Sequence, residues 1–378
     1  SVPLARCFHN IDPQRLTITR TSNPKPKPEL EGLKFGTVLS DHMLVIDWSK
    51  EDGWEAPAIV PYGPFAMDPA TTALHYGLEC FEGMKAYKDA QGKGRLFRPE
   101  KNMERLLKSA KRLCLPEFDT HALQECLTTL ISLEHDWIPD RQGYSLYIRP
   151  TFIATTPALG VGPATNARIF VICSPVGPYY PQGFAPVQIF AETRYHRAWP
   201  GGTGDTKCGG NYAGTILPQV LAMEKGYTQV LWLFGEDNQI TEVGTMNLFI
   251  FLKNEQGVDE LVTAPLDGTI LPGVTRDSIL SLTRDYDEFQ VSERTINMAE
   301  LLKALSEDRV HEVFGAGTAA VVSPVNMVVF EGKEYDIPLV KGDPDAKAGH
   351  LCSRVWKDLL SIQYGETPSP WSVEVPSQ

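Results

Sequence analysis

The stretch Gly201-Gly202-Thr203-Gly204-Asp205-Thr206-Lys207-Cys208-Gly209-Gly210-Asn211-Tyr212 places a single lysine inside a glycine-dense run. Glycine lets the backbone turn sharply and approach a ligand closely. A desolvated lysine in such a run is suited to forming a Schiff base, whereas a solvated one belongs to an ordinary surface loop. Taken alone, the run favours the surface loop, because most glycine-rich segments are turns. The interpretation therefore depends on the other motifs of the chain.

The composition is that of a globular protein with two domains. The chain has 378 residues, which is longer than one hydrophobic core usually supports. Its 42% hydrophobic and 22% charged residues are typical of a globular protein. Its formal net charge of -12 provides no attraction to a nucleic-acid backbone or to an anionic membrane. No apolar run approaches the roughly 20 residues that span a bilayer. We expect neither nucleic acid nor a membrane as a partner.

The cysteines and the N-terminus say little about the compartment. Seven scattered cysteines with no CxxC pair indicate reduced thiols and no metal site. The N-terminus, Ser1-Val2-Pro3-Leu4, lacks a starting Met and an apolar signal core, which is consistent with a removed targeting segment. The mitochondrial matrix and the cytoplasm both remain open.

Hydrophobic periodicity predicts an α/β chain of the α+β type, with strands and a helical pair first and a β-rich half after them. We expect an extended, poorly packed leader at 20–36, strands at 42–48, 80–87, 144–152 and 168–172, and helices at 99–115 and 121–133. In the second half we expect strands at 230–234, 240–243, 247–251, 312–314 and 325–330, and helices at 275–283 and 298–305.

A segment rich in proline and glycine divides the chain. The predicted domains are 1–175, a small N-terminal α/β domain, and 188–378, a larger β-rich domain. Residues 176–187 are the predicted linker.

Three further motifs carry polar chemistry. Glu242 lies in Ile240-Thr241-Glu242-Val243, a mostly apolar strand, where a carboxylate needs a partner unless it faces water at an edge. Thr269 to Asp277 reads as a loop that opens a helix, which is either an anion site made of backbone N–H groups or an ordinary helix cap. Phe314-Gly315-Ala316-Gly317-Thr318-Ala319 follows a predicted strand and resembles a dinucleotide fingerprint.

The dinucleotide interpretation fails on its context. Val321-Val322-Ser323-Pro324 cannot continue a helix, and no βαβ unit follows. An anion-binding turn made of backbone N–H groups remains open. One lysine, one strand glutamate, two such turns and several arginines together form an inventory that fits pyridoxal 5′-phosphate.

The chain as a whole resembles the branched-chain amino acid aminotransferases, which are fold type IV pyridoxal-phosphate enzymes, and most of all the fungal members. The resemblance runs from about Phe35 to Tyr364. It rests on the motifs Phe81-Glu82-Gly83-Met84-Lys85, Tyr147-Ile148-Arg149-Pro150, Gly204-Asp205-Thr206-Lys207, Thr241-Glu242-Val243-Gly244-Thr245-Met246-Asn247, Leu271-Pro272-Gly273-Val274-Thr275-Arg276 and Phe314-Gly315-Ala316-Gly317-Thr318-Ala319.

The resemblance implies a role for each matched residue. Lys207 would be the catalytic Schiff-base lysine, Glu242 would pair with the pyridine nitrogen, and Tyr212 would bind the phenolic oxygen of the cofactor. Arg105 is preferred over Arg98 for the phosphate, together with Val274, Thr275 and Thr318. The substrate carboxylate would meet Thr245 and Ala319. Its side chain would meet Phe35, Tyr76, Phe81, Tyr147, Val161 and Tyr179, of which Tyr76 and Val161 would come from the second subunit of a homodimer.

The implied reaction is reversible amino transfer between L-leucine, L-isoleucine or L-valine and 2-oxoglutarate. The alternatives are another fold type IV enzyme, namely a D-amino acid aminotransferase or an aminodeoxychorismate lyase-like protein, and a non-enzymatic binding protein on the same scaffold.

Arg149 lies one strand step beyond Tyr147, so both side chains face the same side, and we expect Arg149 to bind the second carboxylate of 2-oxoglutarate. Lys85 is expected to be a structural lysine at the site entrance. Animal mitochondrial members carry a redox-active CxxC where this chain has Ala320 and Ser323.

Overall fold

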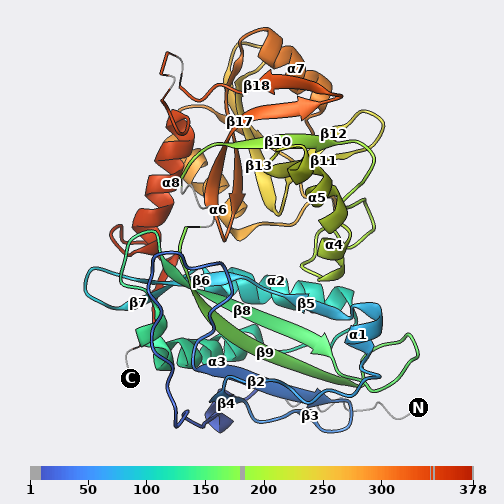
Figure 1. Ribbon diagram of the computed structural model, residues 1–378, viewed down its shortest axis with the longest axis vertical. Helices are drawn as coiled ribbons and strands as arrows, with labels where there is room; N and C mark the ends of the chain where they lie inside the picture. Colours follow the sequence, from blue (N-terminus) through green and yellow to red (C-terminus); the bar gives the residue numbers. More distant parts are fainter. Residues whose placement is uncertain (1–9, 179–183, 341, 344, 377–378) are drawn as a thin grey trace. The chain divides into compact units, whose positions relative to one another are not determined.

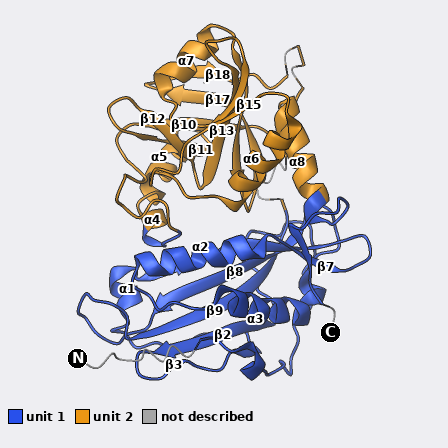
Figure 2. Ribbon diagram, turned by 180° about the vertical axis from the view of Figure 1, so that it is seen from behind, with its two compact units in different colours: residues 1–177, 207–210, 362–378 blue, residues 178–206, 211–361 orange. Residues whose placement is uncertain are grey.

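In the computed structural model, residues 10–178, 184–340, 342–343 and 345–376 are described. The chain forms two compact units. Unit 1 comprises residues 1–177, 207–210 and 362–378, and unit 2 comprises residues 178–206 and 211–361 (Figure 2). The predicted domain division stays a prediction. The units depart from it at 207–210 and 362–378, which the sequence analysis assigned to the second domain and which pack with unit 1.

Unit 1 is built on one sheet in which all pairs but one are antiparallel. The strand order is β1-β4-β2-β9-β8-β6-β7-β19, with β3 beside β2 and β5 beside β8, and the parallel pair is β1–β4. The strands are β1 (Thr17–Ile18), β2 (His42–Ser49), β3 (Gly53–Trp54), β4 (Ala58–Pro61), β5 (Glu79–Phe81), β6 (Met84–Lys88), β7 (Gly94–Phe97), β8 (Ser145–Ala154), β9 (Asn166–Val176) and β19 (Ser372–Glu374).

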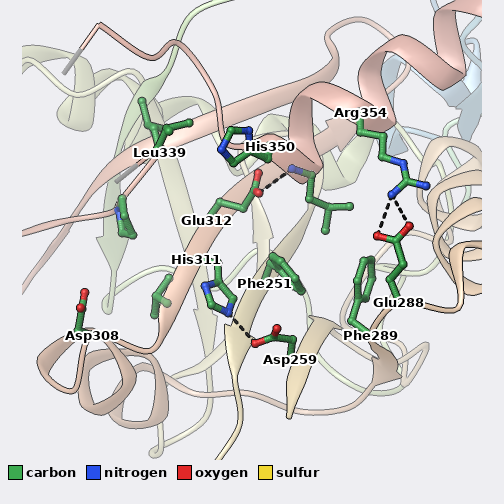
Figure 3. Close-up of a pocket in the computed structure, with 14 residues that line it drawn as sticks. Phe251, Asp259, Glu288, Phe289, Asp308, His311, Glu312, Leu339, His350 and Arg354 are labelled. Atoms are coloured by element: carbon green, nitrogen blue, oxygen red, sulfur yellow. Dashed lines mark hydrogen bonds and ion pairs between the residues drawn. The ribbon is translucent and has the colours of Figure 1, made fainter. Parts of the chain in front are cut away.

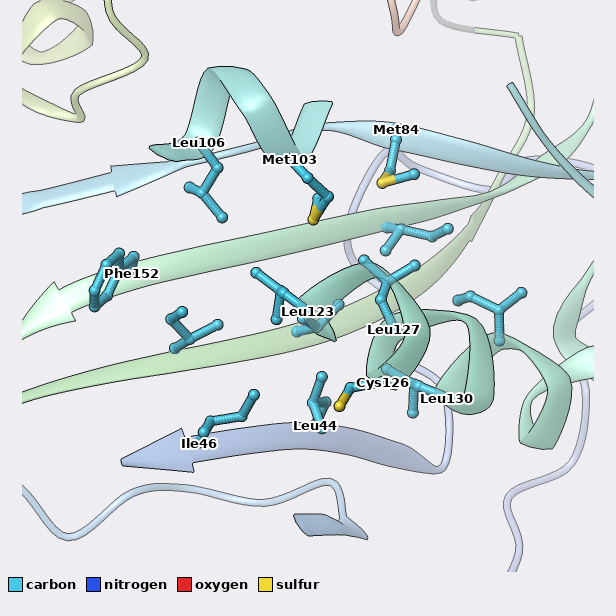
Figure 4. Close-up of a cluster of buried hydrophobic side chains, with 14 of the residues drawn as sticks. Leu44, Ile46, Met84, Met103, Leu106, Leu123, Cys126, Leu127, Leu130 and Phe152 are labelled. Carbon is cyan, nitrogen blue, oxygen red and sulfur yellow. The ribbon is translucent and has the colours of Figure 1, made fainter. Parts of the chain in front are cut away.

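Helices α2 (Pro99–Arg112) and α3 (Thr120–Leu133) pack against the sheet of unit 1 (Figure 1). Proline occupies the first turn of α2, and Asp119 caps α3 by accepting from the His121 and Ala122 N–H groups, as both residue types favour. Their apolar faces form the core with the sheet, and Figure 4 shows this cluster: Met103, Leu106, Leu123, Leu127 and Leu130 from the helices and Leu44, Ile46 and Phe152 from the strands. Shorter elements are α1 (Thr72–Tyr76), η1 (Pro13–Arg15) and η2 (His135–Trp137).

The prediction of one continuous strand at 80–87 is wrong in one respect. The strand is interrupted at Glu82 and Gly83, which separate β5 from β6. A Cβ atom at Gly83 would lie 2.0 Å from the Tyr147 hydroxyl oxygen, so only glycine fits there. The break turns Glu82 into the interior, where its side chain is fully buried. The alternation of polar and apolar residues along 80–87 could not reveal this contact, because Tyr147 lies on β8, which is far away in the sequence although it pairs with β5 and β6.

The sheet of unit 2 closes on itself. Its path is β12-β11-β10-β17-β16-β13-β14-β15, β18 pairs with β17, and β12 also pairs with β13, so six strands form a ring. The strands are β10 (Val187–Glu192), β11 (Gln229–Phe234), β12 (Gln239–Val243), β13 (Met246–Lys253), β14 (Asp259–Thr263), β15 (Gln290–Glu293), β16 (Val310–Gly317), β17 (Val321–Phe330) and β18 (Lys333–Asp336).

The helices of unit 2 are α4 (Gly210–Ala213), α5 (Ile216–Glu224), α6 (Val274–Tyr286), α7 (Met298–Ser306) and α8 (His350–Gln363); α4 and α8 each cross the unit boundary at one end. The turn after Gly317 leads into β17, which pairs antiparallel with β16. This hairpin confirms that the glycine motif does not open a helix and is not a dinucleotide fingerprint.

The leader at 20–36 contains no helix or strand, as predicted, but it is held more firmly than expected. The Lys25 N–H donates to Asp41 Oδ1 over 3.0 Å, and the Thr21 N–H donates to His42 Nε2 over 2.9 Å. These backbone bonds attach the leader to the start of β2. Among the described residues, no helix is long and apolar enough to cross a membrane.

Candidate active site

Lys207 is held by its backbone in unit 1. Its N–H donates to Ser109 Oγ over 2.9 Å, and its carbonyl oxygen accepts from the Phe81 N–H over 3.0 Å. The next residue, Cys208, forms an isolated antiparallel bridge with Cys80. The loop therefore runs beside β5, and the Lys207 amine lies 4.8 Å from the centre of the Phe81 ring. The interpretation of Lys207 as part of a solvated surface loop does not fit this half-buried, well-held position.

Arg149 and Tyr147 face the same side of β8. Arg149 Nη2 donates to the Tyr147 hydroxyl over 3.0 Å, and the guanidinium lies 4.6 Å from the Phe81 ring centre. Its buried Nε has no hydrogen-bond partner. A buried donor without a partner is costly. The Phe35 ring packs edge-on against Tyr147 at 4.8 Å.

Arg105 is buried on α2 and forms a fork with Glu82. Its Nε lies 2.6 Å from Glu82 Oε1 and its Nη2 lies 2.9 Å from Oε2. Asn102 Nδ2 donates to the same carboxylate over 2.8 Å. The fork fixes the guanidinium plane. The competing Arg98 instead lies over the Trp371 ring at 4.6 Å.

Two predicted pocket residues, Tyr76 and Val161, are exposed. Tyr76, at the end of α1, is 43% exposed, and its hydroxyl donates to the Leu159 carbonyl. Val161, between β8 and β9, is 81% exposed. Tyr179 lies outside the described residues. Lys85 is buried on β6, directly across from Tyr147 on β8.

Glu242 is the buried acid of unit 2. Its side chain accepts from the Leu271 N–H over 2.7 Å and from Asn247 Nδ2 over 3.2 Å. Arg197 Nε lies 2.9 Å from its second oxygen. An edge carboxylate facing water would not be buried to 2% exposure, so the expectation of a partnered acid is confirmed. Three donors stabilise the negative charge in this interior.

The start of α6 allows an anion to approach its backbone N–H groups closely. Val274 and Thr275 open the helix after Gly273, which offers no side-chain cap. A Cβ atom at Gly273 would lie 2.1 Å from Asn247 Oδ1. Asn247 Nδ2 also donates to the Leu271 carbonyl over 2.9 Å. Asn247 thereby links Glu242 to the loop before α6, and the first N–H groups of that helix remain suited to an anion.

Two turns of unit 2 lie side by side. Thr245 follows β12, while Thr318 and Ala319 follow β16. The pairing of β13 with β16 matches Asn247 with Ala316, and a Cβ atom at Gly317 would lie 3.9 Å from the Thr245 carbonyl oxygen. The turns that carry Thr245 and Ala319, which are predicted for the substrate carboxylate, are therefore neighbours within unit 2.

Hydrogen bonds fix the glycine-rich loop 201–206 that precedes Lys207. Asn211 Nδ2 donates to the carbonyl oxygens of Thr203 and Thr206 over 2.8 and 2.9 Å. A Cβ atom at Gly204 would lie 2.2 Å from the Ala198 Cβ, which explains one of the glycines. Tyr212 lies half-buried on α4, just after Asn211.

Sequence reasoning assigned no role to Arg197, Asn247 or Glu82. All three lie inside or beside the motifs of the site, but their partners come from distant segments. For Glu82 and Asn247, the available signal was a polar residue within a mostly apolar motif.

The cavity shown in Figure 3, of about 710 Å³, lies in unit 2. Phe251, Phe289 and His311 line it together with Glu312, whose carboxylate accepts from the Leu351 and Cys352 N–H groups. None of the predicted site residues lines it. Within the described part of the chain, no group of three or more His, Cys, Asp or Glu side chains could hold a metal ion.

Residues 79–328 match the family described as amino-transferase class IV. The chain is 53% identical to the branched-chain-amino-acid aminotransferase of Dictyostelium discoideum, over 97% of this chain and 96% of that protein. It is 50% identical to the mitochondrial branched-chain-amino-acid aminotransferase of Schizosaccharomyces pombe, over 96% of this chain and 85% of the relative.

The fold agrees with solved structures. The branched-chain amino acid aminotransferase from Escherichia coli superposes with a TM-score of 0.68 at 26% identity, covering 89% of this chain and 99% of that one. The chain belongs to the class IV aminotransferases. The relatives named above place it beside the branched-chain-amino-acid enzymes of that class.

Proposed function

We infer that the protein is a branched-chain-amino-acid aminotransferase that uses pyridoxal 5′-phosphate. The observation that carries this inference is the 53% identity to a branched-chain-amino-acid aminotransferase over 97% of the chain. The reaction is reversible amino transfer between L-leucine, L-isoleucine or L-valine and 2-oxoglutarate. Retention of Lys207, Glu242 and Thr275 supports an enzyme over a binding protein on the same scaffold.

The residues present fit the cofactor. The uncapped start of α6 at Val274 and Thr275 and the guanidinium of Arg105 suit a phosphate group. Glu242 suits a protonated ring nitrogen, because it is a buried carboxylate with a stabilised charge. We propose that Thr318 adds a phosphate contact and that Tyr212 donates to the phenolic oxygen.

When bound, pyridoxal 5′-phosphate supplies an electron sink for the charge that develops on the substrate α-carbon. Lys207 Nζ would hold the cofactor covalently, and the same amine would take the α-proton of the substrate and return it. Glu242, held by Arg197 and Asn247, keeps its negative charge where it can favour a protonated ring nitrogen. Thr245 and Ala319 orient the substrate carboxylate.

The side-chain pocket must accept both an aliphatic chain and a carboxylate. We propose that Phe35, Tyr76, Phe81, Tyr147, Val161 and Tyr179 provide its apolar walls. Arg149 provides the carboxylate partner, because its buried Nε lacks an acceptor and a buried donor without an acceptor is costly.

We propose that the enzyme is a homodimer in which the partner subunit supplies Tyr76 and Val161. The support is exposure: Val161 is 81% exposed and the neighbouring Leu159 is 66% exposed, although both are apolar. Names of relatives include mitochondrial and cytosolic forms, and we place the protein in one of these two compartments. Fractionation of the source cells decides between them.

The test is a coupled assay of the purified protein with pyridoxal 5′-phosphate and 2-oxoglutarate, with L- and D-leucine side by side. We expect glutamate and 4-methyl-2-oxopentanoate from the L-isomer alone. Turnover of the D-isomer would instead identify a D-amino acid aminotransferase. Absence of turnover with both isomers would refute the proposed function.

A further inference from the structure

Glu79 shares a sheet face with the residues proposed for the substrate side chain. Strand β5 pairs with β8, which matches Glu79 with Ile153 and Phe81 with Thr151. Cross-strand partners and residues two apart share a face, so Glu79, Phe81 and Arg149 project to the same side of unit 1. Cys80, between Glu79 and Phe81, points into the hydrophobic core instead.

Glu79 also lies against the loop of the catalytic lysine. A Cβ atom at Gly209 would lie 1.5 Å from Glu79 Oε1, and the Gly209 N–H donates to the Glu79 carbonyl over 3.4 Å. The carboxylate is therefore packed against the backbone two residues beyond Lys207. A side chain at position 209 would therefore displace the Glu79 carboxylate from this position.

The charges of Glu79 and Arg149 act on each other. Burial raises the pKa of the Glu79 carboxyl, and the positive charge of Arg149 opposes that rise. The guanidinium carbon of Arg149 is 4.6 Å and the Lys207 amine is 4.8 Å from the Phe81 ring centre. Two cations thus lie over one aromatic ring on the face that also carries Glu79.

A single arginine creates a conflict in a pocket that accepts two kinds of side chain. The unbalanced charge of the arginine would disfavour the binding of leucine, because the apolar side chain of leucine gives the guanidinium little solvation. The same charge would bind the second carboxylate of 2-oxoglutarate strongly. A carboxylate of the protein beside the arginine weakens both effects.

We propose that Glu79 is a specificity-determining residue that balances Arg149, so that one pocket accepts both leucine and 2-oxoglutarate. The proposal rests on the proposed function and on the role of Arg149 in it. With leucine bound, Glu79 and Arg149 form a neutral pair. With 2-oxoglutarate bound, Glu79 and the substrate carboxylate compete for one guanidinium.

The test is Glu79→Gln, which preserves size and removes the charge. We expect the KM for 2-oxoglutarate to fall and the KM for L-leucine to rise, each by about three- to tenfold, the size of one partly screened charge interaction. A merely structural role would move both constants in the same direction, and that outcome would overturn the proposal. Glu79→Asp retains the charge and should restore the wild-type ratio of the two constants.

Two further measurements sharpen the test. In an Arg149→Met background, Glu79→Gln should no longer raise the KM for leucine, because no cation remains to be balanced; persistence of the rise would contradict the pairing. In Glu79→Gln, the inhibition constant of glutarate should fall and that of 4-methylpentanoate should rise. These two constants test the proposal without turnover of either compound.

The matched control is Glu117→Gln, which removes a charge from a carboxylate that is 64% exposed and paired with Lys111 in the same unit. It should leave both constants unchanged. If the wild-type protein does not transaminate leucine, the proposed function fails. If it does but the two constants do not diverge in Glu79→Gln, only the role of Glu79 fails.

Discussion

At the scale of single residues, the proposed function gives Lys207 two tasks on one nitrogen. Lys207→Ala should remove both the covalent attachment of the cofactor and the proton transfer at the substrate. We expect the rate to fall by more than the ~10²–10⁴ that acid–base catalysis alone contributes. Borohydride treatment followed by mass spectrometry should find no cofactor attached to the variant. Turnover at the wild-type rate would refute the assignment.

Arg149 should matter more for 2-oxoglutarate than for leucine. Arg149→Met leaves the apolar wall of Phe81 and Tyr147 in place but removes the carboxylate partner. We expect binding of 2-oxoglutarate to weaken by about 2–4 kcal/mol, the cost of breaking a buried charge pair. Single-turnover measurements of each half-reaction check this. Equal losses in both half-reactions would make Arg149 a structural residue.

Among the structural elements, the start of α6 depends on one glycine. In Gly273→Ala the new Cβ would lie 2.1 Å from Asn247 Oδ1, and Asn247 also holds Glu242. Overpacking of this kind costs about 1–3 kcal/mol. We expect weaker binding of pyridoxal 5′-phosphate, measured by absorption titration. Gly63→Ala is the control, because a Cβ atom there has nothing within 4 Å, and an equal loss there would refute the explanation.

Strand β6 carries a buried lysine whose charge should cost stability. Burial lowers the pKa of Lys85 from 10.5 to about 8. The unfolded chain therefore binds more protons between these two values, and this residue's contribution to stability rises as the pH increases from about 8 to about 10.5. Lys85→Met should stabilise the fold most below about pH 8, by up to about 3 kcal/mol, and hardly at all near pH 10.5.

The measurement for Lys85 is urea unfolding of the variant and the wild type at about pH 7 and about pH 10, on either side of the folded-state pKa. The comparison is between the two proteins at each pH, so other groups that titrate in this range cancel. A difference in unfolding free energy that does not shrink with rising pH would show that the lysine's charge does not set the cost.

At the scale of the whole molecule, thiol oxidation should not regulate the enzyme. The six described cysteines are all free. Burial raises the pKa of Cys80, Cys173 and Cys352 well above the usual value and that of Cys126 to about 12. Peroxide attacks the thiolate, so mild treatment should leave activity nearly unchanged.

Cys80 and Cys208 are the pair to examine, because their backbones form a bridge beside Lys207. Peptide mapping after peroxide treatment should find modification at the exposed Cys114 and no link between Cys80 and Cys208. A loss of activity that dithiothreitol reverses, together with that link, would contradict the prediction.

The sequence alone was sufficient for the family and for the longer amphipathic elements, but not for short strands such as β1, β3, β4, β15 and β18 or for helices α4, α5 and α8. The helices at 99–115 and 121–133 and the strands of the second half occur close to the predicted bounds, because periodicity of apolar residues reflects a local rule. The rejection of a dinucleotide fingerprint also held, since Val321, Val322 and Pro324 oppose a helix locally. The motifs around Lys207 and Glu242 were sufficient to indicate the cofactor.

Only the tertiary structure decided which polar groups are partners. Glu82 with Arg105, Arg197 with Glu242, and Glu79 against Gly209 each join segments that are distant in the sequence. The break between β5 and β6 depends on Tyr147, and the return of residues 362–378 to unit 1 depends on long-range packing. Such contacts follow from how faces of sheets and helices meet in space, and no pattern along the chain encodes a single pair of them.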